Sequence, residues 1–136
     1  MFTTDSPRDV LLVGASGLVG QGVLLACLAS PRVGRIVSLV RTAGTTPFAA
    51  TAGDRLQECV LPDFSHAGMR TDTWRGLNAC FYCAGAPPVG TAEPEYRRVT
   101  VNLTVAVARA FAAANPEGRF LYVSGAYADP HSPIMP

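Results

Sequence analysis

Two patterns of apolar and polar residues alternate along the chain. Short stretches that are apolar almost without interruption are separated by longer segments whose apolar residues recur at helical spacing. Continuous apolar runs of this length are typical of strands that are covered on both faces. The pattern predicts five strands, at residues 9–13, 35–40, 58–61, 78–84 and 119–124.

The segment between the first two predicted strands reads as a helix over residues 18–29. Gln21 is almost its only polar residue, and Ser30-Pro31 ends it. A helix that is apolar on all sides is expected to be buried nearly all round. A short surface helix is predicted at residues 69–75.

The longest predicted helix covers residues 92–114. Its apolar residues recur at helical spacing and form two stripes. The first stripe consists of Tyr96, Val99, Leu103, Val107, Ala110 and Ala114. A second apolar stripe is made of Val101, Val105, Ala108 and Ala112. Only one stripe can face the sheet, so the second is expected to need another covering surface.

Alternating strands and helices with right-handed crossovers predict an α/β fold. We expect one Rossmann-type domain over residues 1–136, with a parallel sheet in the order 3-2-1-4-5 and helices on both faces. The last strand then lies at an edge, although its apolar residues are typical of a central strand. We expect a further carboxy-terminal segment or a second copy of the chain to cover it.

Three glycines stand where the first strand turns into the first helix. Gly14, Gly17 and Gly20 form a Gly-x-x-Gly-x-x-Gly motif. In this context the first glycine permits the tight turn, the second lets a diphosphate approach the backbone and the third allows close helix packing. The alternative is a glycine turn that only packs the helix on the strand.

The charge composition limits the partners. The net charge is +1, and all 11 basic residues are arginines that are scattered along the chain. We therefore expect neither a nucleic acid nor an anionic membrane as partner. The complete absence of lysine excludes a Schiff base and a P-loop lysine within these residues.

No signal peptide and no apolar run of membrane-spanning length are visible, so we expect a cytoplasmic protein. Its cysteines, Cys27, Cys59, Cys80 and Cys83, are expected to be reduced thiols. Cys80 and Cys83 resemble half of a metal site, but residues three apart in a strand face opposite ways and no second pair follows. We therefore expect no metal site.

Several short motifs occur along the chain in the order in which they occur in the short-chain dehydrogenase/reductase superfamily. The chain resembles the extended and atypical branch of that superfamily, which contains epimerase/dehydratase-like NAD(P)-binding proteins. The resemblance covers nearly the whole chain. Its motifs are the glycine motif in residues 12–20, Arg41 after the second strand, Asp63-Phe64 after the third, Cys83-Ala84-Gly85 after the fourth, and residues 101–104 and 122–125.

The resemblance implies cofactor contacts in the loops that follow the strands. Gly14 and Gly20 would shape the first loop, and the diphosphate would contact Ser16, Gly17, Leu18 and Val19. The adenine would contact Asp63 and Phe64, and the ribose Ala84 and Gly85.

Arg41 stands where NAD-preferring proteins place an acidic residue that bonds the ribose 2′-hydroxyl. A guanidinium there suits a 2′-phosphate, so we expect NADP(H), with NAD(H) as the alternative. The other interpretation is an ordinary surface arginine.

The resemblance also implies two catalytic candidates. Ser124 matches the serine that bonds the reacting carbonyl, and Asn102 matches a helix asparagine that some members use in a proton relay. Either residue could instead have only a structural role. The Tyr-x-x-x-Lys pair of the superfamily is absent, and Tyr127 and His131 do not replace it because Pro130 opposes the necessary helix.

The sequence thus predicts an NADP(H)-binding Rossmann domain, the amino-terminal part of an oxidoreductase or epimerase that acts on an unknown small molecule. In this interpretation the catalytic helix and the substrate-binding part would follow these residues. The alternative is a non-catalytic dinucleotide-binding module or redox sensor, which would cover its apolar edge by forming a homodimer. Whether the chain is an enzyme is left open.

Overall fold

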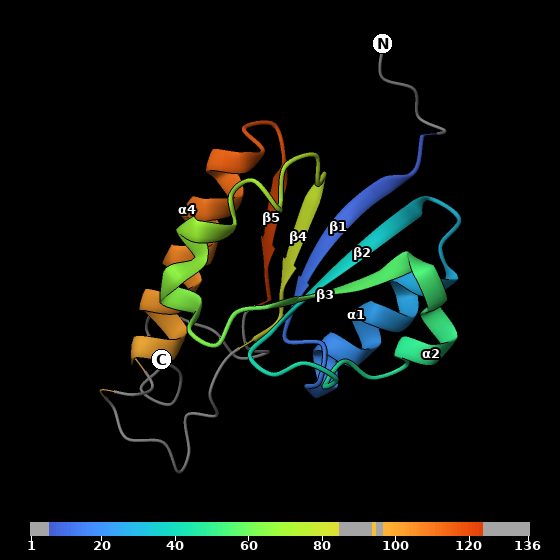
Figure 1. Ribbon diagram of the computed structural model, residues 1–136, viewed down its shortest axis with the longest axis horizontal. Helices are drawn as coiled ribbons and strands as arrows, with labels where there is room; N and C mark the ends of the chain where they lie inside the picture. The colour runs from blue at the N-terminus through green and yellow to red at the C-terminus, as the bar shows by residue number, and fades with distance from the viewer. Residues whose placement is uncertain (1–5, 85–93, 95–96, 124–136) are drawn as a thin grey trace, which may run out of the picture.

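A five-stranded parallel sheet forms the centre of the computed structural model, which describes residues 6–84, 94 and 97–123. The order of the strands is β3-β2-β1-β4-β5, which confirms the predicted topology (Figure 1). The strands are β1 (Arg8–Val13), β2 (Val33–Val40), β3 (Leu56–Val60), β4 (Ala79–Tyr82) and β5 (Arg119–Tyr122).

The register aligns the ends of the strands. Val13, the last residue of β1, pairs with Leu39 of β2 and with Tyr82 of β4. Because all pairs are parallel, the carboxyl ends of neighbouring strands meet at one edge of the sheet, where ligands bind in open α/β folds. The loops that follow the strands are therefore brought together there.

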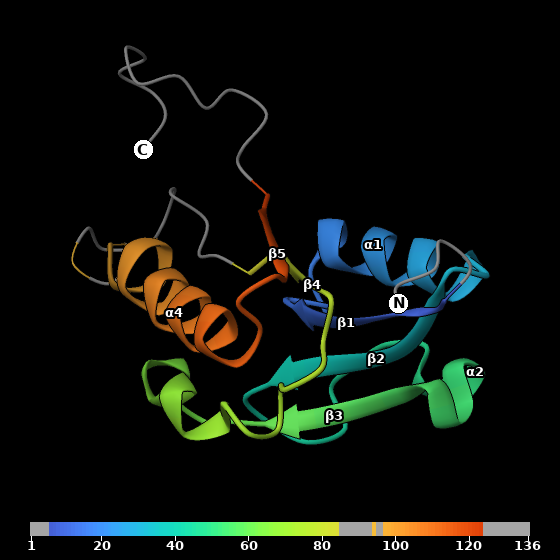
Figure 2. The same ribbon diagram turned by 90° about the horizontal axis from the view of Figure 1, so that it is seen from above.

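Helices cover both faces of the sheet, as predicted (Figure 2). On one face lies α1 (Leu18–Ala29), packed on a small core that includes Val10, Leu12 and Ile36. On the other face lie the 3-10 helix η2 (Phe64–Arg70) and α4 (Thr104–Ala114), over a larger core that includes Trp74 and Phe111. The first apolar stripe of the long helix contributes Leu103, Val107, Ala110 and Ala114 to this larger core.

The expectation that α1 is buried nearly all round was wrong. Only Gly20, Leu24 and Cys27 are buried, and the side chain of Leu25 is 48% exposed. The sheet covers one side of the helix, and no other described element covers the opposite side. The apolar sequence therefore predicted the helix correctly, but it did not show how many sides of the helix are covered.

Several element boundaries also differ from the prediction. The short helix predicted at 69–75 was wrong, because Asp63 accepts the backbone N–H of Ser65 and so begins η2 earlier. The predicted long helix contains a π-helical segment, η3 (Arg98–Leu103), before α4. A short helix α2 (Ala49–Ala52) and a 3-10 turn η1 (Gly53–Arg55) were not predicted.

The strand β5 lies at an edge of the sheet and is exposed, with Leu121, Tyr122 and Val123 each more than a third accessible. On the neighbouring helix Val101 and Val105 are exposed as well, as expected for the second stripe. None of the helices among the described residues is long and apolar enough to cross a membrane.

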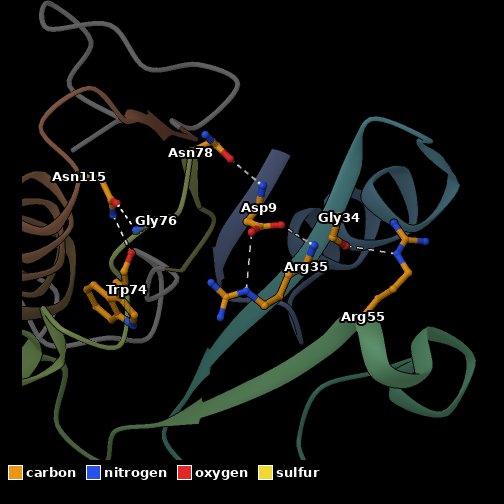
Figure 3. Close-up of polar contacts among 8 residues, drawn as sticks. All are labelled: Asp9, Gly34, Arg35, Arg55, Trp74, Gly76, Asn78 and Asn115. Carbon is orange, nitrogen blue, oxygen red and sulfur yellow. Dashed lines mark hydrogen bonds and ion pairs between the residues drawn. The ribbon is translucent and has the colours of Figure 1, made fainter. Parts of the chain in front are cut away.

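Polar side chains connect the strands at the amino edge of the sheet (Figure 3). The Asp9 carboxylate accepts the backbone N–H of Arg35 at 2.8 Å and lies 3.9 Å from the Arg35 guanidinium. The Asn78 side chain accepts the backbone N–H of Asp9 at 2.9 Å. These bonds join β1 to both of its neighbours.

Two further side chains bond to backbone groups at this edge. The Arg55 guanidinium donates to four backbone carbonyl oxygens, those of Cys27, Leu28, Val33 and Gly34. The Asn115 amide donates to the Trp74 carbonyl oxygen and accepts the Gly76 N–H, both at 2.8 Å. Both side chains therefore have their polar partners within the chain.

Candidate functional site

A cavity of about 360 Å³ opens at the carboxyl edge of the sheet. Its walls come from the loops that follow β1, β2, β3 and β4, so segments far apart in the sequence contribute to one site. The lining residues are Gly14, Ala15, Ser16, Gly17, Leu39, Val40, Arg41, Thr42, Thr45, Thr46, Phe64, Cys83 and Ala84.

Two glycines of residues 14–20, the glycine loop, are required by the packing of the protein itself. Gly14 has a φ of +89°, and a Cβ atom there would lie 2.6 Å from the backbone nitrogen of Ala84. A Cβ atom on Gly20 would lie 1.8 Å from the carbonyl oxygen of Gly14. The turn and the first turn of α1 therefore need glycine at both positions.

Gly17 differs from these two glycines. It precedes α1 with a φ of −76°, which any residue can adopt, and a Cβ atom there would meet only the Gly14 carbonyl oxygen at 3.7 Å. The packing of the described residues therefore does not require glycine at this position. Its missing side chain leaves open the part of the cavity that faces the start of the helix.

The amino terminus of α1 is suited to an anion. Gly17 has no side chain with which to cap the helix, and the first turn contains no acidic residue. Backbone N–H groups and the helix dipole give such a terminus a positive potential. The Gln21 amide donates to the Ser16 carbonyl oxygen at 2.9 Å, which fixes the loop beside this terminus.

Arg41 and Phe64 lie together in the cavity wall. Arg41 directly follows β2, and its guanidinium carbon lies 5.6 Å from the centroid of the Phe64 ring. Phe64 is 6% exposed and belongs to the larger core, so its ring gives the exposed arginine a fixed neighbour. The structure thus brings a cation and an aromatic ring to the same side of the site.

Four of the predicted cofactor contacts do not line the cavity. The Asp63 carboxylate accepts the N–H and hydroxyl of Ser65 at 2.9 and 2.7 Å. Leu18 and Val19 have exposed side chains on the first turn of α1, and Gly20 is buried. These three can contribute only backbone groups or helix packing to the site.

The remaining predicted residues are distributed differently. Ala84 lines the cavity beside Gly14, whereas Gly85 and Ser124 lie outside the described residues. Asn102 is exposed in η3 and does not line the cavity. Its π-helical segment is nevertheless a type of local geometry that is frequent at functional sites.

Sequence reasoning did not assign the threonines of the cavity, Thr42, Thr45 and Thr46, or Cys83 to the site. A polar loop after a strand was visible, but nothing in it indicated which side chains turn inward. Burial raises the pKa of the Cys83 thiol, and the nearby thiol of Cys27 raises it further. The Cys83 thiol is therefore protonated and uncharged at pH 7.

No family model matches this chain. Among curated proteins it is 28% identical to the leucinostatins biosynthesis cluster protein T of Purpureocillium lilacinum, over 85% of this chain and 42% of that protein. It is also 28% identical to D-lysergyl-peptide-synthetase subunit 3 of Claviceps purpurea, over 95% of this chain and 9% of that protein. The chain thus spans less than half the length of these relatives.

Solved structures similar to this chain include several dehydrogenases and reductases. A short-chain dehydrogenase of Burkholderia cenocepacia in complex with NADP has a TM-score of 0.68 at 17% identity, covering 88% of this chain and 54% of that one. WbmG of Bordetella bronchiseptica in complex with NAD has a TM-score of 0.66 at 18% identity, covering 90% and 39%.

A third similar structure is the thiolation-reductase di-domain of an archaeal non-ribosomal peptide synthetase. Its TM-score is 0.70 at 18% identity, over 86% of this chain and 35% of that chain. At such low identity the similarity identifies the fold. The resemblance predicted from the sequence motifs is confirmed at this level: the chain has the Rossmann fold of the short-chain dehydrogenases/reductases.

Proposed function

We propose that the cavity binds NADP(H) and that this chain is the cofactor-binding Rossmann part of a short-chain dehydrogenase/reductase-like protein. The observation that carries the proposal is the open space at Gly17. The packing of the described residues gives no reason for glycine there, whereas a diphosphate that approaches the start of α1 would need that space.

In this proposal each wall of the cavity contacts one part of the cofactor. The diphosphate contacts the backbone of Ser16 and Gly17 and the first amides of α1. The adenine lies near Phe64 and Asp63, and the ribose lies along Ala84 and Gly85. The NADP and NAD found in complexes with the same fold support a nicotinamide dinucleotide as the ligand.

The proposal is tested by fluorescence titration of the chain with NADPH. Gly17→Ala should weaken binding by about tenfold to a hundredfold, because the new methyl group occupies the space of the diphosphate. The fold should be retained, since losing a glycine N-cap costs at most about 1 kcal/mol. Gly22→Ala is the matched control, because Gly22 lies on the same helix with open space around it. Wild-type protein that binds no dinucleotide at millimolar concentration would refute the proposal.

The preference for NADP(H) over NAD(H) is proposed to come from Arg41. Arg41→Ala should lower the affinity for NADPH by about tenfold or more, because the 2′-phosphate loses a charged partner, and should leave NADH binding nearly unchanged. Arg75→Ala removes an equally charged but distant surface arginine and serves as the control. An unchanged NADPH affinity in Arg41→Ala would show that Arg41 is an ordinary surface residue.

For the whole protein we propose an oxidoreductase or epimerase, in which these 136 residues are the amino-terminal part. The cofactor would supply hydride transfer, Ser124 would bond the reacting carbonyl, and Asn102 would assist proton transfer. The acid group would come from another part of the protein, which would also cover β5. Comparing the intact mass with the open reading frame tests this: a mass equal to these residues would contradict it.

A non-catalytic dinucleotide-binding module is the second candidate. It is favoured by the absence of lysine, since no Tyr-x-x-x-Lys pair can form within these residues. Such a module would bind NADPH without consuming it and would form a homodimer through β5. NADPH oxidation followed by absorbance with a panel of aldehydes and ketones separates the two candidates, because turnover would exclude the module.

A further inference from the structure

Glu58 bonds the loop that follows β2, although it lies on the neighbouring strand. We call residues 41–46 the β2 loop. The Glu58 carboxylate accepts the backbone N–H of Gly44 at 2.7 Å, the backbone N–H of Thr46 at 3.0 Å and the hydroxyl of Thr46 at 2.5 Å. One carboxylate thus accepts three bonds from two residues of a loop that has no regular structure.

The bonds continue into the sheet. Ser38 pairs with Glu58 in the register of β2 and β3, and the Ser38 and Thr46 hydroxyl oxygens are 2.8 Å apart. The Thr46 hydroxyl donates to the carboxylate, so the Ser38 hydroxyl must donate to Thr46. Ser38 and Thr46 are 0% and 7% exposed, so the bond between their hydroxyls is buried, whereas the bonds to Glu58 are partly exposed. The buried Ser38 hydroxyl thereby gives the partly exposed bonds to Glu58 a fixed attachment to β2.

The residues held in this way form one wall of the cavity. Arg41, Thr42, Thr45 and Thr46 line it, whereas Glu58 does not. Gly44 has a φ of +82°, which favours glycine, and its N–H donates to the carboxylate in this conformation. Within the loop one further bond joins the Thr45 hydroxyl to the Thr42 carbonyl oxygen. The shape of this wall therefore depends on Glu58.

We infer that Glu58 is a positioning residue that determines discrimination between NADPH and NADH. The inference rests on the proposed function and adds a residue outside the cavity. Glu58 accepts the N–H groups of Gly44 and Thr46, so these amides are not free to bind a phosphate. A 2′-phosphate would then be recognised by Arg41 and Thr42. The bonds to Glu58 hold the β2 loop, and with it these two residues, in place.

The test compares the affinities of the full chain for NADPH and for NADH, which differ only in the 2′-phosphate. Glu58→Gln should lower NADPH affinity by about tenfold and NADH affinity by less than about threefold. Thr46→Val, which keeps the carboxylate but removes the hydroxyl, should shift the ratio of affinities in the same direction. Glu117→Gln is the control, because it removes an exposed carboxylate at the opposite edge of the sheet.

The outcomes separate a positioning role from a merely structural one. An unchanged ratio of NADPH to NADH affinity in both variants, whether the two affinities fall equally or stay the same, would overturn the role of Glu58. It would leave the proposed function intact. A wild-type chain that binds neither dinucleotide would refute the proposed function and this inference with it. If Glu58→Gln does not fold, as judged by circular dichroism, the ratio in Thr46→Val decides alone.

Discussion

The two edges of the sheet use polar groups in opposite ways. At the amino edge, Asp9, Asn78, Arg55 and Asn115 bond to backbone groups of the chain itself (Figure 3). At the carboxyl edge the start of α1 has no side-chain cap and borders an open cavity. The polar side chains named at the amino edge bond within the chain, whereas the start of α1 at the carboxyl edge leaves backbone groups that an external ligand can bind.

Two arginines illustrate the difference. Arg55 donates to four backbone carbonyl oxygens, so its hydrogen-bonding groups are used in joining α1, β2 and η1. Arg41 is exposed at the cavity, where its guanidinium lies over the Phe64 ring and forms no ion pair with a carboxylate of the described residues. The same residue type therefore stabilises the fold at one edge and is available for binding at the other.

If the amino edge stabilises the fold and the carboxyl edge binds the ligand, most substitutions at the carboxyl edge should lower ligand affinity and leave the free energy of unfolding nearly unchanged. Gly20→Ala should break this rule and have the largest effect, because its methyl group would overlap the Gly14 carbonyl oxygen. We expect a loss of about 3 kcal/mol or more in the free energy of unfolding, measured by urea denaturation.

The control for Gly20→Ala lies two residues further along the same helix. Gly22 has no heavy atom within 4 Å of its ideal Cβ position. Gly22→Ala should therefore raise the free energy of unfolding by about 0.5–1 kcal/mol, because alanine favours the helix. Equal effects of the two substitutions would contradict the backbone contact between α1 and the glycine loop.

At the amino edge, Arg55→Ala should lower the free energy of unfolding by about 1–3 kcal/mol, because four partly buried carbonyl groups lose a charged donor. Its affinity for NADPH should stay at the wild-type value. Arg75→Ala, which removes an exposed ion pair with Asp72, should cost less than about 0.5 kcal/mol. A large loss of cofactor affinity in folded Arg55→Ala would show that the edges are not independent.

The smallest expected effect is a pH dependence at the carboxyl edge. The hydrogen bond from the Gly44 N–H, together with those from Thr46, lowers the pKa of Glu58 below its usual value. The carboxylate therefore stabilises the fold above the unfolded pKa of about 4.3, and this contribution is lost as the pH falls through the lower folded value. Partial exposure limits it to less than about 1 kcal/mol.

Urea denaturation at pH 7 and at pH 4 or below measures this contribution. The difference in free energy of unfolding between the wild type and Glu58→Gln should shrink as the pH falls. A difference that stays constant over this range would mean that the three bonds do not depend on the charge of Glu58.

The sheet could be predicted from the sequence because its signals are local. Each strand is a short apolar run, and the glycine motif marks the point at which the first strand ends. The resemblance also suggested that Gly14, Gly17, Arg41, Phe64 and Ala84 belong to one site, and in the structure these residues line one cavity. Parallel strands bring them together because the strands end at one edge of the sheet.

Other features depend on contacts that no local pattern contains. The bonds between Glu58 and the β2 loop join residues on different strands, so neither the loop nor the strand alone indicates them. The helix predicted at residues 69–75 was placed too late in the chain because the prediction did not include the cap that Asp63 provides for Ser65. The exposed side of α1 was not predicted because the apolar composition of a helix does not show how many of its sides are covered by other elements.

The close contact between Gly14 and Ala84 has a consequence for folding. The glycine loop lies against Ala84, which follows β4, so this neighbour of the loop is synthesised much later than the loop itself. A growing chain that has not yet reached residue 84 lacks this wall of the cavity, even if β1 and α1 have formed. Ligand affinity at this loop should therefore appear only after β4 has been synthesised and has joined the sheet.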